Sequence, residues 1–224
     1  MKSIKDWPHM RKCETLENYP NIKGYDFGKE FDFRKFLDSF ATTGFQATNL
    51  GAGIEIVNQM IDNKAKVMLA FTGNAVSSGL REIIAFLAKN RHVDVIVTSG
   101  AGIEEDVIKC LKPFVVGSFE APGRTLFESG VGRIGNIFAP YDRYAYFEKF
   151  MDPFIEKSHK QRKGKPVTPT RFNELLGLEL NNRESFLYWA AKNSIPVFCP
   201  GLIDGAIGDL MYFYKNSHKD FHLD

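Results

Sequence analysis

Cysteine is scarce in this sequence: Cys13, Cys110 and Cys199 are the only three among 224 residues. An odd number with no Cys-x-x-Cys pair gives no disulfide framework. Free thiols favour a reducing compartment, so we expect a cytoplasmic protein. The first 12 residues include basic side chains but no apolar segment of the kind found in secretory signals. No apolar run is long enough to span a bilayer, so we expect no membrane association.

A large excess of charge is also absent. The formal net charge is +2, which points to neither nucleic acid nor a membrane surface as a partner. The basic stretch 157–165 lacks interleaved aromatic residues, so we expect a solvated loop there rather than a nucleic-acid site. His218 and His222 have a spacing that could ligate a metal, but no motif places a third ligand, so we expect no metal site.

The hydrophobic pattern divides the chain into an N-terminal arm, 1–30, and an α/β domain, 31–224. Short apolar runs typical of buried strands alternate with amphipathic helical segments. Strands are expected at 67–71, 93–97, 114–116, 134–139 and 196–199. Helices are expected at 31–40, 50–63, 79–87, 104–111, 144–157, 169–177, 184–193 and 208–214, with Trp189 in the core. This alternation predicts a mostly parallel, Rossmann-like sheet with helices on both faces.

Three strand-to-helix corners share a composition of glycine and small polar residues. They span 71–79, 97–106 and 200–209. Ligands bind at the carboxyl ends of parallel strands, where such loops converge. Glycine lets the backbone approach a ligand, and free N–H groups at helix starts favour phosphate. The corners therefore predict a dinucleotide site, although Gly100-Ala101-Gly102 lacks the third glycine of the usual fingerprint.

The second and third corners also gather five carboxylates: Glu104, Glu105, Asp106, Asp204 and Asp209. Acidic residues at helix starts are often only caps, an interpretation that fits Asp106 and could fit Glu104. Five carboxylates beside a phosphate site would repel an anion. They are explained if some bind ribose hydroxyls and others bind a cation, so the simplest ligand pair is a dinucleotide and a di- or polyamine.

At these corners the sequence resembles the deoxyhypusine synthase family. The segments that carry the resemblance occur in order from about Lys23 to the C-terminus: Gly24–Phe27, Thr42–Leu50, Asn74–Gly79, Val93–Asp106, Arg133–Asn136, Ile195–Phe198 and Asp204–Asp209. The resemblance implies an enzyme that uses NAD to oxidise spermidine. It passes the aminobutyl group through an enzyme-lysine imine to a lysine of a translation factor. Family members form tetramers with active sites shared across dimer interfaces.

Site residues follow from the resemblance position by position. The expected NAD contacts are Asn74, Ala75, Ser77, Ser99, Gly100, Ala101, Glu105 and Asp204. Glu104 and Asp209 match the family's spermidine carboxylates. Gly73 departs from the family's usual serine, which puts one hydrogen bond to the cofactor in doubt.

The family's nucleophilic lysine lies in a segment beyond the point that matches Asp224, and no lysine here, including Lys192, Lys215 and Lys219, matches its motif. We therefore expect an incomplete sheet and no catalytic residue in this chain. The first hypothesis is one chain of a two-chain deoxyhypusine synthase, with a complementary C-terminal chain supplying the lysine. A non-catalytic regulatory paralogue of a full-length synthase and a homospermidine synthase-like enzyme are the alternatives.

Overall fold

The computed structural model describes residues 16–162 and 165–222. The chain forms two compact units, Met1–Ala65 and Lys66–Asp224. The sequence placed the start of the α/β domain at residue 31, whereas the helices between 33 and 62 fall in the first unit. The assignment of 31–224 to one ligand-binding domain stays a prediction.

Over its described residues, 16–65, the first unit has three helices, α1 (Phe33–Asp38), α2 (Phe40–Thr43) and α3 (Phe45–Asp62). The side chain of Asp32 caps α1 by accepting the Lys35 N–H at 3.0 Å. Gly44 adopts φ 94°, a conformation that other residues avoid, and this allows α3 to start directly after α2.

The second unit is built on a parallel sheet of β1 (Met68–Phe71), β2 (Val95–Thr98) and β6 (Val197–Phe198) in the order β1-β2-β6. Leu69 is opposite Ile96, and Ile96 is opposite Val197. Helices follow each strand, which confirms the predicted α/β class. They are α4 (Gly73–Ser77), α5 (Arg81–Lys89), α6 (Gly100–Leu111), α8 (Asp142–Arg162), α9 (Pro169–Leu180), α10 (Phe186–Lys192) and α11 (Ala206–Ser217).

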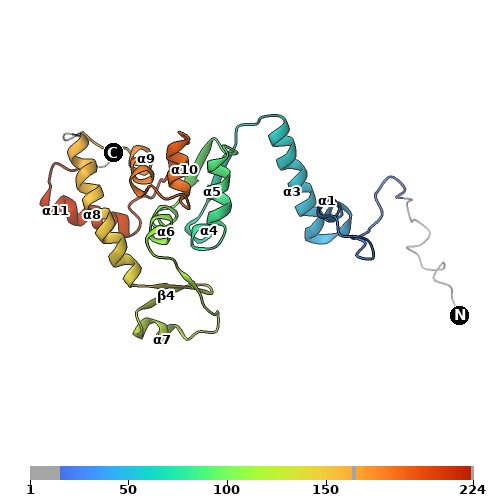
Figure 1. The fold of residues 1–224 in the computed structure, drawn as a ribbon, viewed down its shortest axis with the longest axis horizontal. Coiled ribbons are helices and arrows are strands. Elements are labelled where there is room, and N and C mark those ends of the chain that lie inside the picture. The colour runs from blue at the N-terminus through green and yellow to red at the C-terminus, as the bar shows by residue number, and fades with distance from the viewer. Residues whose placement is uncertain (1–15, 163–164, 223–224) are drawn as a thin grey trace, which may run out of the picture. The chain divides into compact units, whose positions relative to one another are not determined.

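The core lies between this sheet and its helices. Helix α10 lies beside both α5 and α9 (Figure 1). The largest fully buried side chains include Phe147, Phe172, Phe186, Ile96, Ile103 and Ile155. Trp189, expected in the core, packs against it only partly, because its Nε1 donates to the Arg183 carbonyl at 2.8 Å and its ring faces Lys89.

The segment 114–141 differs from the prediction. Its strands β3 (Val115–Val116), β4 (Val131–Ile134) and β5 (Ile137–Pro140) form a separate antiparallel sheet with α7 (Gly123–Glu128). The single strand predicted at 134–139 was therefore wrong. Gly135 has φ 60°, so the Gly-Asn pair turns the chain back on itself between β4 and β5.

The positions of several helices also need correction. Helix α6 begins at Gly100, four residues before the predicted start, and α4 occupies part of the first predicted loop. Helix α8 continues to Arg162, so most of the predicted loop 157–165 is helical, while 163–164 lie outside the described residues. Lysine, glutamine and arginine are good helix formers, and a polar composition alone did not separate a loop from an exposed helix end.

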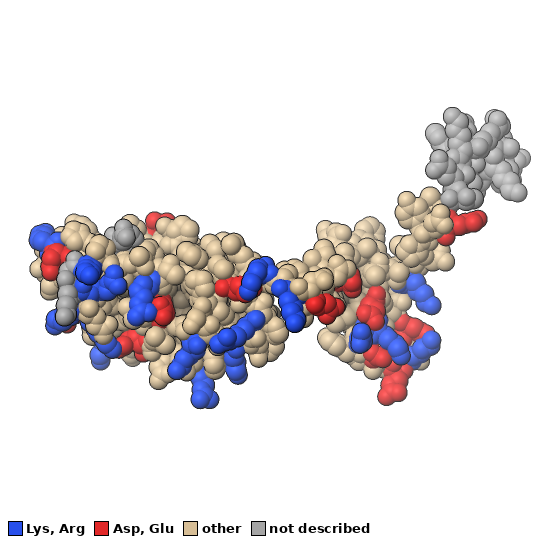
Figure 2. All heavy atoms as spheres, turned by 90° about the horizontal axis from the view of Figure 1, so that it is seen from above, with Lys and Arg blue, Asp and Glu red and all other residues tan. Residues whose placement is uncertain are grey.

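The surface of residues 66–224 carries both signs of charge on the face drawn in Figure 2. Within the described residues, no helix combines the length and the apolar character needed to cross a membrane. Across 16–162 and 165–222, no group of three or more His, Cys, Asp or Glu side chains is arranged to hold a metal ion. Cys110 and Cys199 are free thiols, and Cys13 lies outside the described residues.

Candidate functional site

The structure brings the three corners into contact at the carboxyl ends of β1, β2 and β6. The backbone N–H of Gly73 donates to Ser99 Oγ at 3.1 Å. A Cβ added at Gly73 would lie 2.5 Å from Ala101 Cβ, and one at Gly100 would lie 2.9 Å from the Gly201 carbonyl oxygen. Two glycines are therefore required by close packing between corners.

An open groove of about 640 Å³ lies at this edge of the sheet. Four of the predicted NAD contacts line it: Ser99, Gly100, Ala101 and Asp204. Ser99 precedes α6 but its side chain makes no capping bond to that helix. The Gly102 N–H bonds to the Ser99 carbonyl at 3.0 Å, so the N–H groups of Gly100 and Ala101 before it are the ones left for a ligand. A helix N-terminus of this length favours an anion such as a pyrophosphate.

Three more of the predicted NAD contacts, Asn74, Ala75 and Ser77, lie on α4. Asn74 is exposed, Ala75 is half-buried and Ser77 is buried. The Ser77 hydroxyl is within hydrogen-bonding distance of the Gly73 carbonyl oxygen, at 3.2 Å, and of the Glu105 carboxylate. Ser77 and the predicted cofactor residue Glu105 thus face each other, and neither lines the groove itself.

Glu104 is a buried carboxylate whose Oε1 accepts the Ile207 N–H at 2.8 Å, at the start of α11. Burial raises its pKa; the Ile207 N–H opposes that rise and the charge of Asp209 adds to it. Asp209 is exposed in the first turn of α11. The two predicted spermidine carboxylates are therefore electrostatic neighbours, and a bound cation would relieve their repulsion.

Glu105 is also buried, and burial raises its pKa, with the charge of Glu104 adding to the rise and the Ser77 hydroxyl opposing it. Tyr144, near the start of α8, is a neighbour that the sequence did not single out. The tyrosine is 39% exposed, so its burial is only partial; this partial burial and then the charges of Glu104 and Glu105 raise the pKa of its phenol. No local pattern marks this tyrosine, because only the packing of α8 on α6 brings it to the acids.

Asp106 points away from this cluster. Its Oδ2 accepts the Ser185 hydroxyl at 2.6 Å and the Leu187 N–H at 3.1 Å, so it caps α10. Arg81, also buried, has NH1 3.9 Å from Oδ1. Burial raises the Asp106 pKa to about 6. The interpretation of Asp106 as a cap at the start of its own helix was wrong, because α6 begins at Gly100 and Asp106 lies inside it; its carboxylate instead accepts hydrogen bonds at the start of α10.

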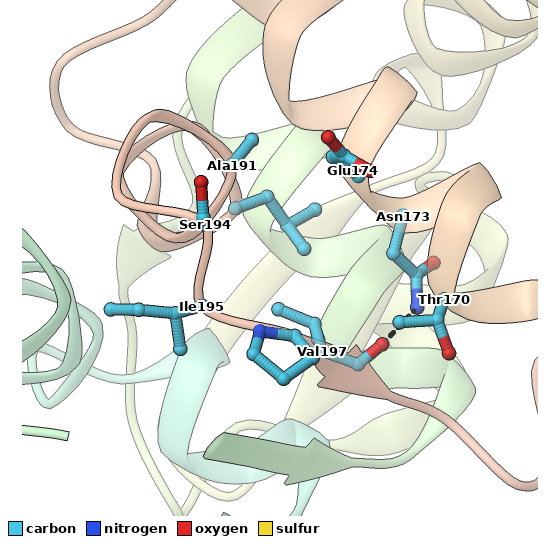
Figure 3. A pocket seen from close by; sticks show the side chains of 9 residues that line it. Thr170, Asn173, Glu174, Ala191, Ser194, Ile195 and Val197 are labelled. Atoms are coloured by element: carbon cyan, nitrogen blue, oxygen red, sulfur yellow. Dashed lines mark hydrogen bonds between the residues drawn. The ribbon is translucent and has the colours of Figure 1, made fainter. Parts of the chain in front are cut away.

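A second cavity, of about 150 Å³, lies where β6 begins rather than where it ends. Figure 3 shows Asn173 on α9 reaching the strand, where its Nδ2 donates to the Val197 carbonyl at 3.0 Å. None of the predicted site residues lines this cavity.

Lys192 and Lys215, which match no nucleophile motif, contact groups of this chain's own fold. Lys192 Nζ lies 5.9 Å from the centroid of the Tyr188 ring, and Lys215 Nζ donates to the Phe221 carbonyl at 2.5 Å. His218 Nδ1 lies 3.1 Å from the Tyr214 carbonyl oxygen, and the His222 carbonyl accepts the Val167 N–H at 3.3 Å. These contacts tie the end of the chain to its own fold.

Comparison with known proteins decides the family. The deoxyhypusine synthase family model matches residues 35–224. The chain belongs to the deoxyhypusine synthase family. Relatives include deoxyhypusine synthase from Senecio vernalis, 44% identical over 91% of this chain, and homospermidine synthase 2 from the same plant, 43% identical over 93%. A crystal structure from Entamoeba histolytica, assigned as a deoxyhypusine synthase, superposes with a TM-score of 0.65 at 28% identity, covering 91% of this chain and 70% of that one.

The resemblance drawn from the corner motifs is therefore confirmed at the level of the family, and so is the α/β fold that it implied. The chain spans about three-fifths of the length of its curated relatives, with 62% of the Senecio deoxyhypusine synthase and 63% of the homospermidine synthase covered. The two Senecio relatives carry different names at nearly equal identity. Overall similarity therefore does not separate the two named activities.

Proposed function

We propose that residues 66–224 form the NAD- and spermidine-binding part of a deoxyhypusine synthase, which transfers the aminobutyl group of spermidine to a lysine of a translation factor. One observation carries this proposal. The uncapped N-terminus of α6 opens on a groove, and the same helix holds Glu104 and Glu105 buried one turn further on. An anionic cofactor and a cationic substrate can thus bind side by side.

The residues present fit NAD. A side chain at position 100 would meet the Gly201 carbonyl oxygen, so this position is a glycine and the backbone at the start of α6 is open to a ligand. In this proposal the N–H groups after Ser99 bind the pyrophosphate, and Asp204 and Glu105 accept hydrogen bonds from ribose hydroxyls. When bound, NAD supplies the acceptor for the hydride lost by the amine.

The acids orient the amine. Glu104 has one carboxylate oxygen bonded to Ile207, which fixes the direction of the side chain and leaves the second oxygen for an ammonium group. Asp209 supplies a second, more exposed negative charge one turn into α11. Tyr144 borders the same acids and can donate a hydrogen bond to a carboxylate or to the substrate.

Calorimetric titrations of the purified chain with NAD, and with spermidine in the presence of NAD, test this assignment. Glu104→Gln keeps an oxygen for the Ile207 N–H but removes the charge, so spermidine affinity should fall about tenfold or more while NAD affinity stays. Asp209→Asn should act in the same direction. Glu179→Gln, which removes an exposed pair with Lys157, is the matched control. Equal spermidine affinity in Glu104→Gln and wild type would contradict the role of Glu104.

The nucleophilic lysine lies, in our proposal, outside residues 1–224, on a complementary segment or chain that completes the site in a tetramer of the family type. Co-expression with a C-terminal-half partner, followed by labelling of the translation factor with spermidine and NAD, tests this. A lack of labelling would favour the regulatory alternative, in which this chain activates a full-length synthase without needing its own Glu104 or Asp209. Free thiols at Cys110 and Cys199 fit the cytoplasm as the place of that assembly.

Homospermidine synthesis is the second candidate function, because a homospermidine synthase is as similar to the chain as the deoxyhypusine synthases are. The two differ in the acceptor of the aminobutyl group. A competition assay that offers the translation factor and putrescine to the assembled enzyme distinguishes them by which product accumulates.

A further inference from the structure

Helix α4 is held by two side chains that lie one turn apart on α6. Glu105 faces the hydroxyl of Ser77. Lys109 Nζ donates to the carbonyl oxygens of Val76 and Ser78, at 2.7 Å each, and lies 3.3 Å from that of Ser77. These are carbonyls of the last turn of α4, which have no partner within their helix. The three donors of an ammonium group match them, and its positive charge suits a helix C-terminus.

The geometry of α4 depends on such contacts. The helix has five residues, far fewer than a helix needs to be stable by itself in water. At its other end the Gly73 N–H donates to Ser99 Oγ. Lys109 is half-buried and does not line the groove, so its ammonium group is used inside the fold rather than for a ligand.

We propose that Lys109 is a positioning residue for the cofactor: by clamping the C-terminal carbonyls of α4, it holds Asn74 and Ala75, which follow the groove-lining Thr72, in place to contact NAD. This inference rests on the proposed function, because α4 matters to the cofactor only if the groove binds NAD. Lys109 touches neither the groove nor the acids for the amine. Its charge also lowers the pKa of Glu105, so amide exchange in α4 and the combination with Asn74→Ala distinguish an effect through α4 from an effect on Glu105.

The test replaces Lys109 with methionine in the full chain, which keeps an unbranched side chain, one atom shorter, and removes the charge. Lys149→Met, at an exposed lysine of α8, is the matched control. The first measurement, made without NAD, is amide hydrogen exchange at Ala75 and Ser78, whose N–H groups bond to Thr72 and Asn74. Protection there should fall about tenfold or more, because charge-assisted hydrogen bonds are lost, while the Ile96 amide in the sheet keeps its protection.

The second measurement is the dissociation constant for NAD, which should rise about tenfold in Lys109→Met and stay unchanged in Lys149→Met. Asn74→Ala should weaken NAD binding in the wild type but add little in the Lys109→Met background, since α4 is already displaced. Fully additive losses would show that Lys109 does not act through α4. A general loss of stability would lower protection in the sheet as well as in α4.

Unchanged exchange at Ser78, or an NAD dissociation constant within twofold of wild type, overturns the inference. A wild-type chain that binds no NAD overturns the proposed function and the cofactor role of Lys109 with it, whereas the exchange data still decide whether Lys109 holds α4. If Lys109→Met does not fold, Lys109→Gln, which retains two donors, should show intermediate exchange and intermediate affinity; values equal to wild type in both would count against the clamp.

Discussion

Gly73 and Ala101 form a steric pair whose two members should depend on each other. The Cβ of a residue at position 73 would lie 2.5 Å from Ala101 Cβ, about 1 Å inside ordinary contact, and 3.2 Å from the Ala101 carbonyl carbon. Gly73→Ser introduces the serine that the family resemblance predicts at this position, and it therefore forces α4 and α6 apart. Overpacking of this kind costs about 1–3 kcal/mol in the free energy of unfolding.

Removing the obstructing methyl group should reverse that cost. Ala101→Gly alone should cost about 0.5–1 kcal/mol, because glycine in a helix loses more backbone entropy than alanine. If the two changes were independent, the double variant would lose about 1.5–4 kcal/mol, the sum of the two. We expect instead a loss close to that of Ala101→Gly by itself, so the coupling energy should be about 1–3 kcal/mol in favour of the pair.

Equilibrium urea unfolding of the wild type, both single variants and the double variant measures this coupling, with far-UV circular dichroism and tryptophan fluorescence as independent probes. Strictly additive losses would refute the steric reasoning. A stable Gly73→Ser single variant would do the same, since it would mean that the two corners can separate without cost. Glycine at 73 would then be an incidental departure from the family rather than a consequence of alanine at 101.

Three further predictions rest on single contacts. Asp106→Asn should flatten the pH dependence of the free energy of unfolding between about pH 4 and pH 6. The folded carboxyl has a pKa of about 6 against an ordinary 3.8, so the native state binds more protons than the unfolded state in this window. The stability of the wild type therefore falls as the pH rises through the window. An unchanged slope in urea titrations would contradict this. Gly177→Ala should lower the free energy of unfolding by about 1–3 kcal/mol, because the new Cβ would lie 2.3 Å from the Leu187 carbonyl oxygen. Gly53→Ala in α3, where the new Cβ would meet nothing within 4 Å, should be neutral or stabilising. Similar thermal shifts for the two variants would count against close packing of α9 on α10. Replacing Ser185 with alanine should lower the free energy of unfolding by about 1 kcal/mol or more, because it removes both the cap of α10 and a donor to Asp106. A loss below about 0.5 kcal/mol in urea unfolding would show that the Leu187 N–H alone satisfies the Asp106 carboxylate.

Much of the second unit was predictable from local signals. Short apolar runs flanked by glycine identified β1, β2 and β6, and the order of strand, corner and helix required a parallel arrangement, because only crossover connections join such strands. The same logic predicts the three corners at one edge of the sheet, because parallel strands end on the same side. The family followed from the same corners, because their residues occur in a fixed order along the chain.

Tertiary structure alone decided how the acids are used. Five carboxylates look alike in the sequence, yet packing directs Asp106 to α10, Glu104 to α11 and Glu105 to Ser77. The partners lie 28 to 103 positions away along the chain, beyond the reach of any local pattern. The same holds for Tyr144, which reaches the acids only because α8 packs on α6, and for Lys109, whose spacing from Glu105 also fits an ordinary exposed pair on a helix surface.

The turn at Gly135 was missed although a local signal marks it. A Gly-Asn pair favours a turn, but the apolar residues that follow it were interpreted as one strand over 134–139. What the sequence by itself determined is the parallel α/β framework and the composition of its ligand edge, since periodicity and glycine act over neighbouring residues. Which carboxylate supports a helix and which remains for a ligand depended on long-range packing, because burial and hydrogen-bond partners are set only when distant helices meet.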